Sequence, residues 1–176
     1  MIKKISILFL ISLSLFLLFN CGGPEKSAKE YWKSAKLLAD VGNFEGAMKE
    51  FKNITKYYAD DSLAPKALQR IAEIHRTELK NYKKAISTYK SFLNKYPNNS
   101  KAPNILFLIG YTYANDIENK TKKAKSIYNK FLDKYPDHEL VKSVKWELKN
   151  LGKSPDDIIK SQDSSYSGTS PQAINK

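Results

Sequence analysis

The sequence AKSIYNKFLDKYP at residues 124–136 has two close counterparts earlier in the chain, AISTYKSFLNKYP at 85–97 and AMKEFKNITKYYA at 47–59. The copies begin 38 and 39 residues apart. Each has alanine first, an aromatic residue four positions later and a bulky apolar residue three positions after that. These positions share one face of an α-helix, so each copy predicts a helix with one apolar stripe. A repeat of this length is typical of stacked helical hairpins.

A second helix is predicted before each copy, with a small residue in its middle. The small residues are Ala35, Ala72 and Gly110, and each lets a neighbouring helix approach closely. The spacing from the small residue to the alanine of the copy grows from twelve to thirteen to fourteen residues. We expect the added residues to lie in the turn between the two helices. The pattern predicts helices at 27–40, 44–58, 63–77, 82–95, 102–114, 120–134 and 139–150.

The starts of the first helices of the second and third pairs also share a pattern, DDSLAPKAL at 60–68 and NNSKAPNIL at 98–106. Ser62 and Ser100 are placed to cap these helices, and a proline in the first turn loses no helical hydrogen bond. The last predicted helix has no partner after it. A more polar, unpaired final helix is how repeat arrays usually end.

These features resemble the tetratricopeptide repeat, which pairs a helix A carrying a small residue with a helix B like the quoted copies. The long period and the SxAP helix starts are similar to the BamD-type branch, named after the lipoprotein of the outer-membrane β-barrel assembly machine. The resemblance covers about 27–151. It implies an all-α solenoid of about three hairpins plus a C-terminal capping helix. It also implies a non-enzymatic scaffold for protein partners of the bacterial envelope, possible partners including a β-barrel assembly subunit.

A second hypothesis for the function of the chain stays open. BamD relatives carry more repeats than this chain. A CpoB-like repeat protein, linked to Tol-Pal and cell division, is similarly short. Such proteins usually have an N-terminal coiled coil and no lipid anchor, and no heptad segment lies between Cys21 and the first repeat.

Residues 1–20 predict an export signal, because Lys3 and Lys4 precede an apolar run at 5–19 that is shorter than the roughly 20 residues of a spanning helix. With the cysteine that follows, they resemble a lipoprotein-type signal peptide. Cys21 is the chain's single cysteine and resembles the lipidated cysteine of bacterial lipoproteins. Phe19 and Asn20 stand where that family prefers small residues, so an uncleaved anchor is one alternative. A cysteine without a role near an ordinary cleavage point is the other. Residues 21–26 would form a lipidated tether. The resemblance implies the periplasmic face of the outer membrane.

The remaining segments and charges favour neither a catalytic site nor a nucleic-acid partner. Residues 152–176 are polar and Ser-rich, which predicts a mostly disordered tail. The net charge of +12 comes from lysines spread over every predicted helix, and with an export signal we expect no nucleic-acid partner. No catalytic motif occurs, and neither His75, expected in packing, nor His138, expected in a solvated turn, has a second ligand at useful spacing. We expect no enzyme, cofactor or metal.

The expected binding site follows from the resemblance, which implies that helix-A faces line a concave groove for partner peptides. Helix-A positions off the packing stripe would point into this groove, and aromatic residues and arginine are common interface anchors. Covering the core is the open alternative for the two tryptophans, which stand at the array ends. The predicted partner-groove residues are Trp32, Lys36, Gln69, Glu73, Arg76, Phe107, Tyr111 and Trp146.

Overall fold

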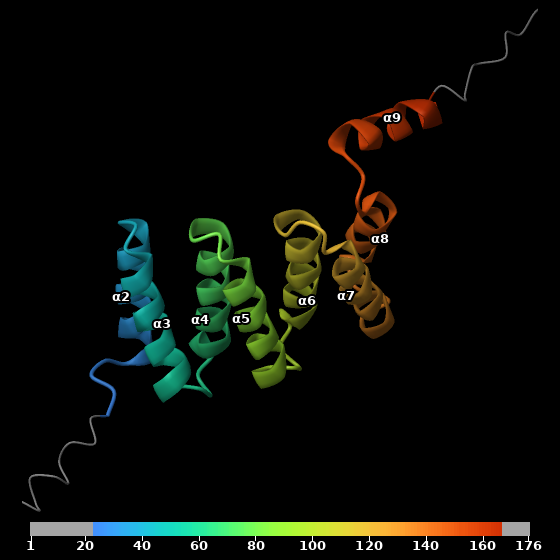
Figure 1. The fold of residues 1–176 in the computed structure, drawn as a ribbon. Helices are drawn as coiled ribbons and strands as arrows, with labels where there is room; N and C mark the ends of the chain where they lie inside the picture. The colour runs from blue at the N-terminus through green and yellow to red at the C-terminus, as the bar shows by residue number, and fades with distance from the viewer. Residues whose placement is uncertain (1–22, 167–176) are drawn as a thin grey trace, which may run out of the picture. The chain divides into compact units, whose positions relative to one another are not determined.

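The computed structural model of the chain describes residues 23–166, and 161–166 only by their backbone. This part of the chain is all-α, which confirms the predicted fold class, and the helices found in it are too short or too polar to cross a membrane (Figure 1). The predicted leader and Cys21 lie outside the described residues. The elements are α2 (Ala28–Asp40), α3 (Phe44–Tyr57), α4 (Leu63–Glu73), η1 (Ile74–Glu78), α5 (Tyr82–Lys95), α6 (Ala102–Tyr111), η2 (Thr112–Asp116), α7 (Thr121–Lys134), α8 (Val141–Asn150) and α9 (Pro155–Tyr166).

The chain divides into two compact units, Met1–Ile71 and Ala72–Lys176. Unit 1 contains the α2–α3 hairpin and most of α4. Unit 2 begins at the end of α4 and contains every element from η1 onward. Each unit is described below by itself.

In unit 1, α2 and α3 pack against each other along the expected stripe. Tyr31 and Ala35 of α2 and Ala47, Phe51 and Ile54 of α3 are all buried, with exposed fractions of 3% or less. Burying an aromatic or large aliphatic side chain stabilises a fold by about 1.5–3 kcal/mol. This stripe is therefore the main source of stability of the first hairpin.

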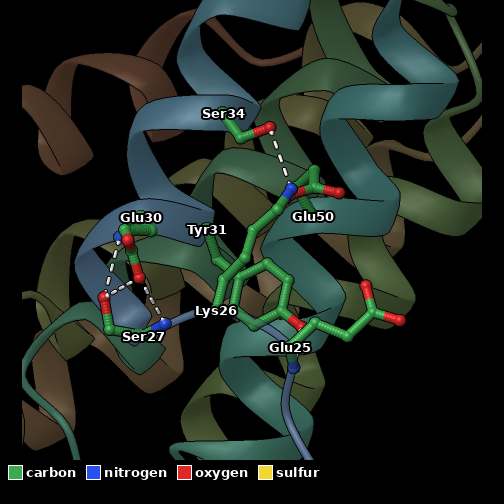
Figure 2. A network of polar contacts seen from close by, with 7 residues as sticks. All are labelled: Glu25, Lys26, Ser27, Glu30, Tyr31, Ser34 and Glu50. Carbon is green, nitrogen blue, oxygen red and sulfur yellow. Dashed lines mark hydrogen bonds and ion pairs between the residues drawn. The ribbon is translucent and has the colours of Figure 1, made fainter.

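The segment before α2 is fastened to the first hairpin by Lys26 (Figure 2). Its ammonium group lies 2.8 Å from a carboxylate oxygen of Glu50, and its carbonyl oxygen accepts a hydrogen bond of 2.8 Å from the Tyr58 hydroxyl. The backbone N–H of Glu25 donates to the hydroxyl of Tyr31 at 3.2 Å. The chain therefore has a fixed path into α2 from Glu25 onward.

The turn between the helices of each pair contains one residue in the left-handed conformation. These residues are Gly42, Lys80 and Asn119, with φ of 77°, 49° and 56°. In the first two turns the next residue is an asparagine, Asn43 or Asn81, whose side-chain oxygen accepts from the backbone N–H three residues on, at 2.9 and 3.2 Å. Each asparagine thereby satisfies one unpaired N–H at the start of the following helix.

Most of the added residues of the second and third pairs lie in the helices and not, as predicted, in the turns. Helix α2 ends five residues after Ala35, whereas η1 and η2 end six residues after Ala72 and Gly110. A π-helical turn accommodates one inserted residue within a helix. The prediction was therefore wrong for one added residue in the second pair and one in the third. The other added residue of the third pair does lie in the turn, which has four residues there and three in the other pairs.

The starts of the later first helices are held by side chains other than the serines that we expected, and in the second and third pairs by the residue directly before the serine. Asp61, Asn99 and His138 each accept a hydrogen bond from the backbone N–H two residues on, at 2.7, 2.9 and 3.1 Å. The predicted caps were wrong, because the short side chains of Asp61 and Asn99 compete for the N–H two positions ahead more strongly than serine does. Ser62 and Ser100 are exposed. His138 is half-buried instead of solvated.

The core of unit 2 joins α6, α7 and α8. Leu106, Tyr128, Phe131 and Val144 are buried together, and Val144 is the contribution of α8. Helix α8 thus covers the end of α7, as expected of the capping helix. Its Trp146 remains 48% exposed.

The small residue Gly110 lies directly against the aromatic ring of Tyr128. A Cβ atom built on Gly110 would stand 2.5 Å from Cε1 and 2.7 Å from Cδ1 of that ring. Both residues are buried, so the ring has no space into which it could withdraw. The contact fixes how closely α6 and α7 approach each other.

Helix α9 differs from the predicted disordered tail. Ser154 and Asp157 form a capping box at its start, with the Asp157 N–H donating to the serine oxygen at 3.2 Å and the serine hydroxyl donating to the carboxylate at 2.7 Å. Pro155 occupies the first helical position, where proline costs no hydrogen bond. The prediction weighed apolar periodicity and overlooked these local signals. Residues 167–176 lie outside the described residues.

Replacing Gly110 with alanine should lower the free energy of unfolding. Overpacking a buried contact costs about 1–3 kcal/mol, whereas alanine improves helix propensity by about 1 kcal/mol, so we expect a net loss of up to about 2 kcal/mol. Urea denaturation followed by circular dichroism measures this change. Ser126→Ala, at an exposed site on α7, is the control and should be neutral or slightly stabilising. A gain of about 1 kcal/mol in Gly110→Ala, the full effect of helix propensity, would contradict the contact.

The left-handed turn positions should respond to substitution with opposite signs. Gly42→Ala forces a side chain into a conformation that costs about 1–2 kcal/mol and should destabilise the fold. Lys80→Gly removes that cost from the second turn and loses only about 0.5–1 kcal/mol of backbone entropy, so it should be neutral or stabilising. Thermal unfolding of both variants checks the pair. A loss of stability in Lys80→Gly equal to that in Gly42→Ala would refute the argument.

Candidate partner-binding face

Three predicted site residues of unit 2 form one connected group of side chains. The Arg76 guanidinium, in η1, lies 5.8 Å from the centre of the Tyr111 ring. Tyr111 and Phe107 follow each other on α6 with ring centres 6.2 Å apart. Phe107 in turn lies 6.0 Å from the buried ring of Tyr128. The group is therefore anchored in the core at one end, and Arg76, Tyr111 and Phe107 are all half-buried.

Asp116 holds Arg76 in place. Its carboxylate, in η2, lies 3.1 Å from Nη1 of Arg76, and the two side chains are 19% and 22% exposed. Burial alone would lower the pKa of Arg76, but the hydrogen bond and the charge of Asp116 outweigh burial and raise it. A pair this poorly solvated is held more firmly than a surface ion pair, because water competes less for both groups.

Two buried tyrosine hydroxyls lie beneath this group. Those of Tyr89 and Tyr128 have no hydrogen-bond partner within the described residues. Burial, reinforced by the Glu73 carboxylate and partly offset by Arg76, raises the pKa of Tyr89 to about 12. Burial and the neighbouring Glu147 carboxylate likewise raise the pKa of Tyr128. Glu73 is thus placed beside Tyr89, at the end of α4.

The fifth predicted residue of unit 2, Trp146, has a different environment. It lies on α8 with about half of its surface exposed, and its carbonyl oxygen accepts a hydrogen bond of 3.0 Å from the side chain of Asn150. Such an exposed indole is available for a contact with another protein.

The remaining three predicted residues lie in unit 1. The Trp32 ring meets the buried ring of Phe51 edge-on, with centres 5.1 Å apart and planes at 63°. Its packing role is therefore evident, in line with the open alternative of covering the core. Lys36 is exposed on α2, and Gln69 is half-buried on α4.

Sequence reasoning missed Asp116, which orients Arg76. The residue lies in the longest insertion of the repeats, and the prediction treated that insertion as a loop. A signal was available in the sequence. The longer third pair has an acid, Asp116, after its small residue, and the longer second pair has an arginine, Arg76, after its small residue. Because both insertions become π turns, they bring these two charges together.

The group offers a cation, aromatic faces and carboxylates, and these can hold a polypeptide by ion pairing, stacking and burial. Within residues 23–166 no grouping of three or more His, Cys, Asp or Glu residues could hold a metal ion. The arrangement of the described side chains suits binding.

The raised pKa of Tyr89 predicts a loss of stability in alkali. Its unfolded form ionises near pH 10 and its folded form near pH 12, so its contribution is complete below pH 10 and is lost as the pH rises to about 12. Tyr89→Phe should reduce the fall in Tm over this window, without loss at neutral pH, because the removed hydroxyl is unpaired. Tyr57→Phe, at a half-buried site in unit 1, should follow the wild type. Parallel curves for all three proteins would contradict the assigned cause.

Comparison with known protein families assigns two segments of the chain. Residues 66–99 and 105–138 match the tetratricopeptide repeat. They correspond to α4–η1–α5 and to α6–η2–α7, the two pairs that contain π turns. No curated protein sequence matches the chain. Tetratricopeptide repeats are generally non-catalytic scaffolds, and the chain therefore carries repeats of the kind that mediate protein–protein interaction.

Proposed function

We propose that this protein is a lipid-anchored scaffold of the bacterial envelope that binds a partner polypeptide through the helix-A side of its repeats. The observation that carries the binding part is the group of Arg76, Tyr111 and Phe107. These side chains are ordered by Asp116 and Tyr128 yet remain partly accessible. Ordered aromatic and arginine side chains lose little conformational entropy when a partner binds, which favours them as anchors.

The fixed path of the chain at Lys26 supports a short connection to a membrane. If Cys21 carries the lipid, four residues separate it from Lys26, and four residues span at most roughly 14 Å. The contacts of Glu25 and Lys26 with the first hairpin leave little of the predicted tether 21–26 free to extend. Unit 1 would then stand close to the membrane surface.

A BamD-like role in outer-membrane protein assembly is the function that we place first. It is supported by the 38- and 39-residue period, by the shared helix starts at Asp61 and Asn99, and by the lipoprotein-like Cys21. The number of repeats is smaller than in BamD relatives, so the chain would cover only part of a comparable partner surface.

Affinity capture from detergent-solubilised envelopes tests this proposal. The wild-type protein should recover a β-barrel assembly subunit, identified by mass spectrometry, and a Phe107→Ala/Tyr111→Ala variant should recover it at least about tenfold less. Trp146→Ala provides a second variant, because its side chain is half exposed and its removal should leave the fold intact. Thermal unfolding verifies that each variant is folded.

Two controls separate the parts of the proposal. Ile159→Ala removes an exposed apolar side chain from α9 and should not change recovery. Cys21→Ser should release the protein from the membrane fraction without abolishing capture in detergent. Recovery of Tol-Pal components would favour the CpoB-like role. Equal recovery by the wild type and both groove variants would refute the assigned face.

A further inference from the structure

A second surface of unit 2 lies between the two helix-B elements, α5 and α7. Two hollows of about 310 and 460 Å³ occur there, and a third of about 350 Å³ adjoins them at the turn before α5. Lys90 lines the first and second, and Lys83 and Ile117 line the second and third, so the hollows adjoin one another along one surface. We name it the lysine groove.

The walls of the lysine groove come from single stripes of α5 and α7. On α5 the lining residues fall three, four, seven and ten or eleven positions after Lys83. On α7 they fall three, seven, ten and fourteen positions after Lys120, which lies at its N-terminal boundary. These spacings keep to one face of a helix. Six of the wall residues are lysines: Lys83, Lys90, Lys120, Lys123, Lys130 and Lys134.

The floor of the groove is apolar and is supplied by the helix between the walls. The floor consists of Leu106 and Ile109 of α6, which are almost fully buried, and of Tyr113 of η2 and the adjoining Ile117, whose half-buried side chains supply the accessible apolar surface. The ammonium group of Lys123 lies 5.6 Å from the centre of the Tyr113 ring, so wall and floor are in contact. A partner would therefore meet apolar surface in the middle and positive charge on both sides.

Among the side chains that the structure describes, no carboxylate neutralises the positive charge of the walls. No aspartate or glutamate lines any of the three hollows. Within the described residues, none of the six lysines is paired with a carboxylate. Lysines gathered in this way repel one another, and an acidic partner would relieve the repulsion.

We propose that the lysine groove binds an acidic amphipathic segment of another protein, with apolar side chains on the floor and carboxylates against both walls. Nucleic acid would satisfy the lysines but would gain nothing from the floor. A membrane surface would meet the rims, whereas the apolar floor is recessed between two helices. An amphipathic helix whose apolar stripe is flanked by acids matches both features.

Fluorescence anisotropy with a designed peptide tests the proposal on the full-length protein in non-ionic detergent. The probe is a fluorescein-labelled helical peptide with leucine at i, i+3, i+4 and i+7 and glutamate on both flanks. We expect saturable binding that weakens with added salt, since the charges are partly solvated. A second peptide with glutamine in place of every glutamate should bind at least about tenfold more weakly.

Variants locate the binding site. Lys90→Glu/Lys123→Glu should weaken binding of the acidic peptide at least about tenfold and should bind a peptide with lysine in place of glutamate. Lys84→Glu/Lys125→Glu reverses two exposed lysines of the same helices outside the groove and should change affinity less than about twofold. Phe107→Ala/Tyr111→Ala should retain peptide binding, which separates this groove from the helix-A face.

Three outcomes would overturn the proposal. One is equal loss of peptide binding in both lysine variants, which would indicate nonspecific charge attraction. Another is that the peptide does not bind, while the wild type prefers phosphatidylglycerol vesicles to phosphatidylcholine vesicles and only the Lys90→Glu/Lys123→Glu variant loses this preference. That result would assign the groove to lipid. The third is conversion of a wild-type dimer to a monomer by that variant in light scattering, which would assign it to a second copy.

Discussion

The arrangement of unit 2 depends on the close approach of α6 and α7 at Gly110. A single methyl group at this position would collide with the Tyr128 ring, so the distance between the helices is set by the absence of a side chain. The Tyr128 ring is then in contact with two residues of α6, Gly110 and Phe107. The half-buried aromatic residues of the helix-A face are consequently ordered by the same contact that orders the core.

That constraint also explains where the π turns form. The packed middle of each first helix cannot take up an additional residue without losing the small-residue contact. The inserted residue is therefore accommodated after it, in the last turn, where packing is less demanding. Arg76 and Asp116 both lie in these widened turns and face each other at 3.1 Å. The ion pair of the candidate site is thus a consequence of how the repeat absorbs its insertions.

The sequence predicts the repeated helices well because the stripe of alanine, aromatic and apolar residues follows the period of a helix, and one buried face is enough to reveal it. Features decided by hydrogen bonds of one or two side chains were predicted poorly. Asp61 and Asn99 hold the helix starts instead of the neighbouring serines, and Ser154 begins a helix in a segment without an apolar stripe. Asp116 was missed for a related reason, since its role requires the three-dimensional position of Arg76. The lysine groove was missed because its lysines come from two helices that are separated in the sequence by α6 and η2.

Helix α6 and the turn η2 contribute opposite faces to two different surfaces. Phe107 and Tyr111 belong to the helix-A face, whereas Leu106, Ile109 and Tyr113 form the floor of the lysine groove. The two surfaces share a rigid element but no side chain, and their chemistries differ, one aromatic with a paired arginine and the other apolar with unpaired lysines. Partners at the two surfaces would therefore bind without competing. If both recognised sequences belong to one complex, the second contact becomes intramolecular once the first has formed. Modest affinities at each surface would then combine into stable attachment, without any conformational change in the repeats.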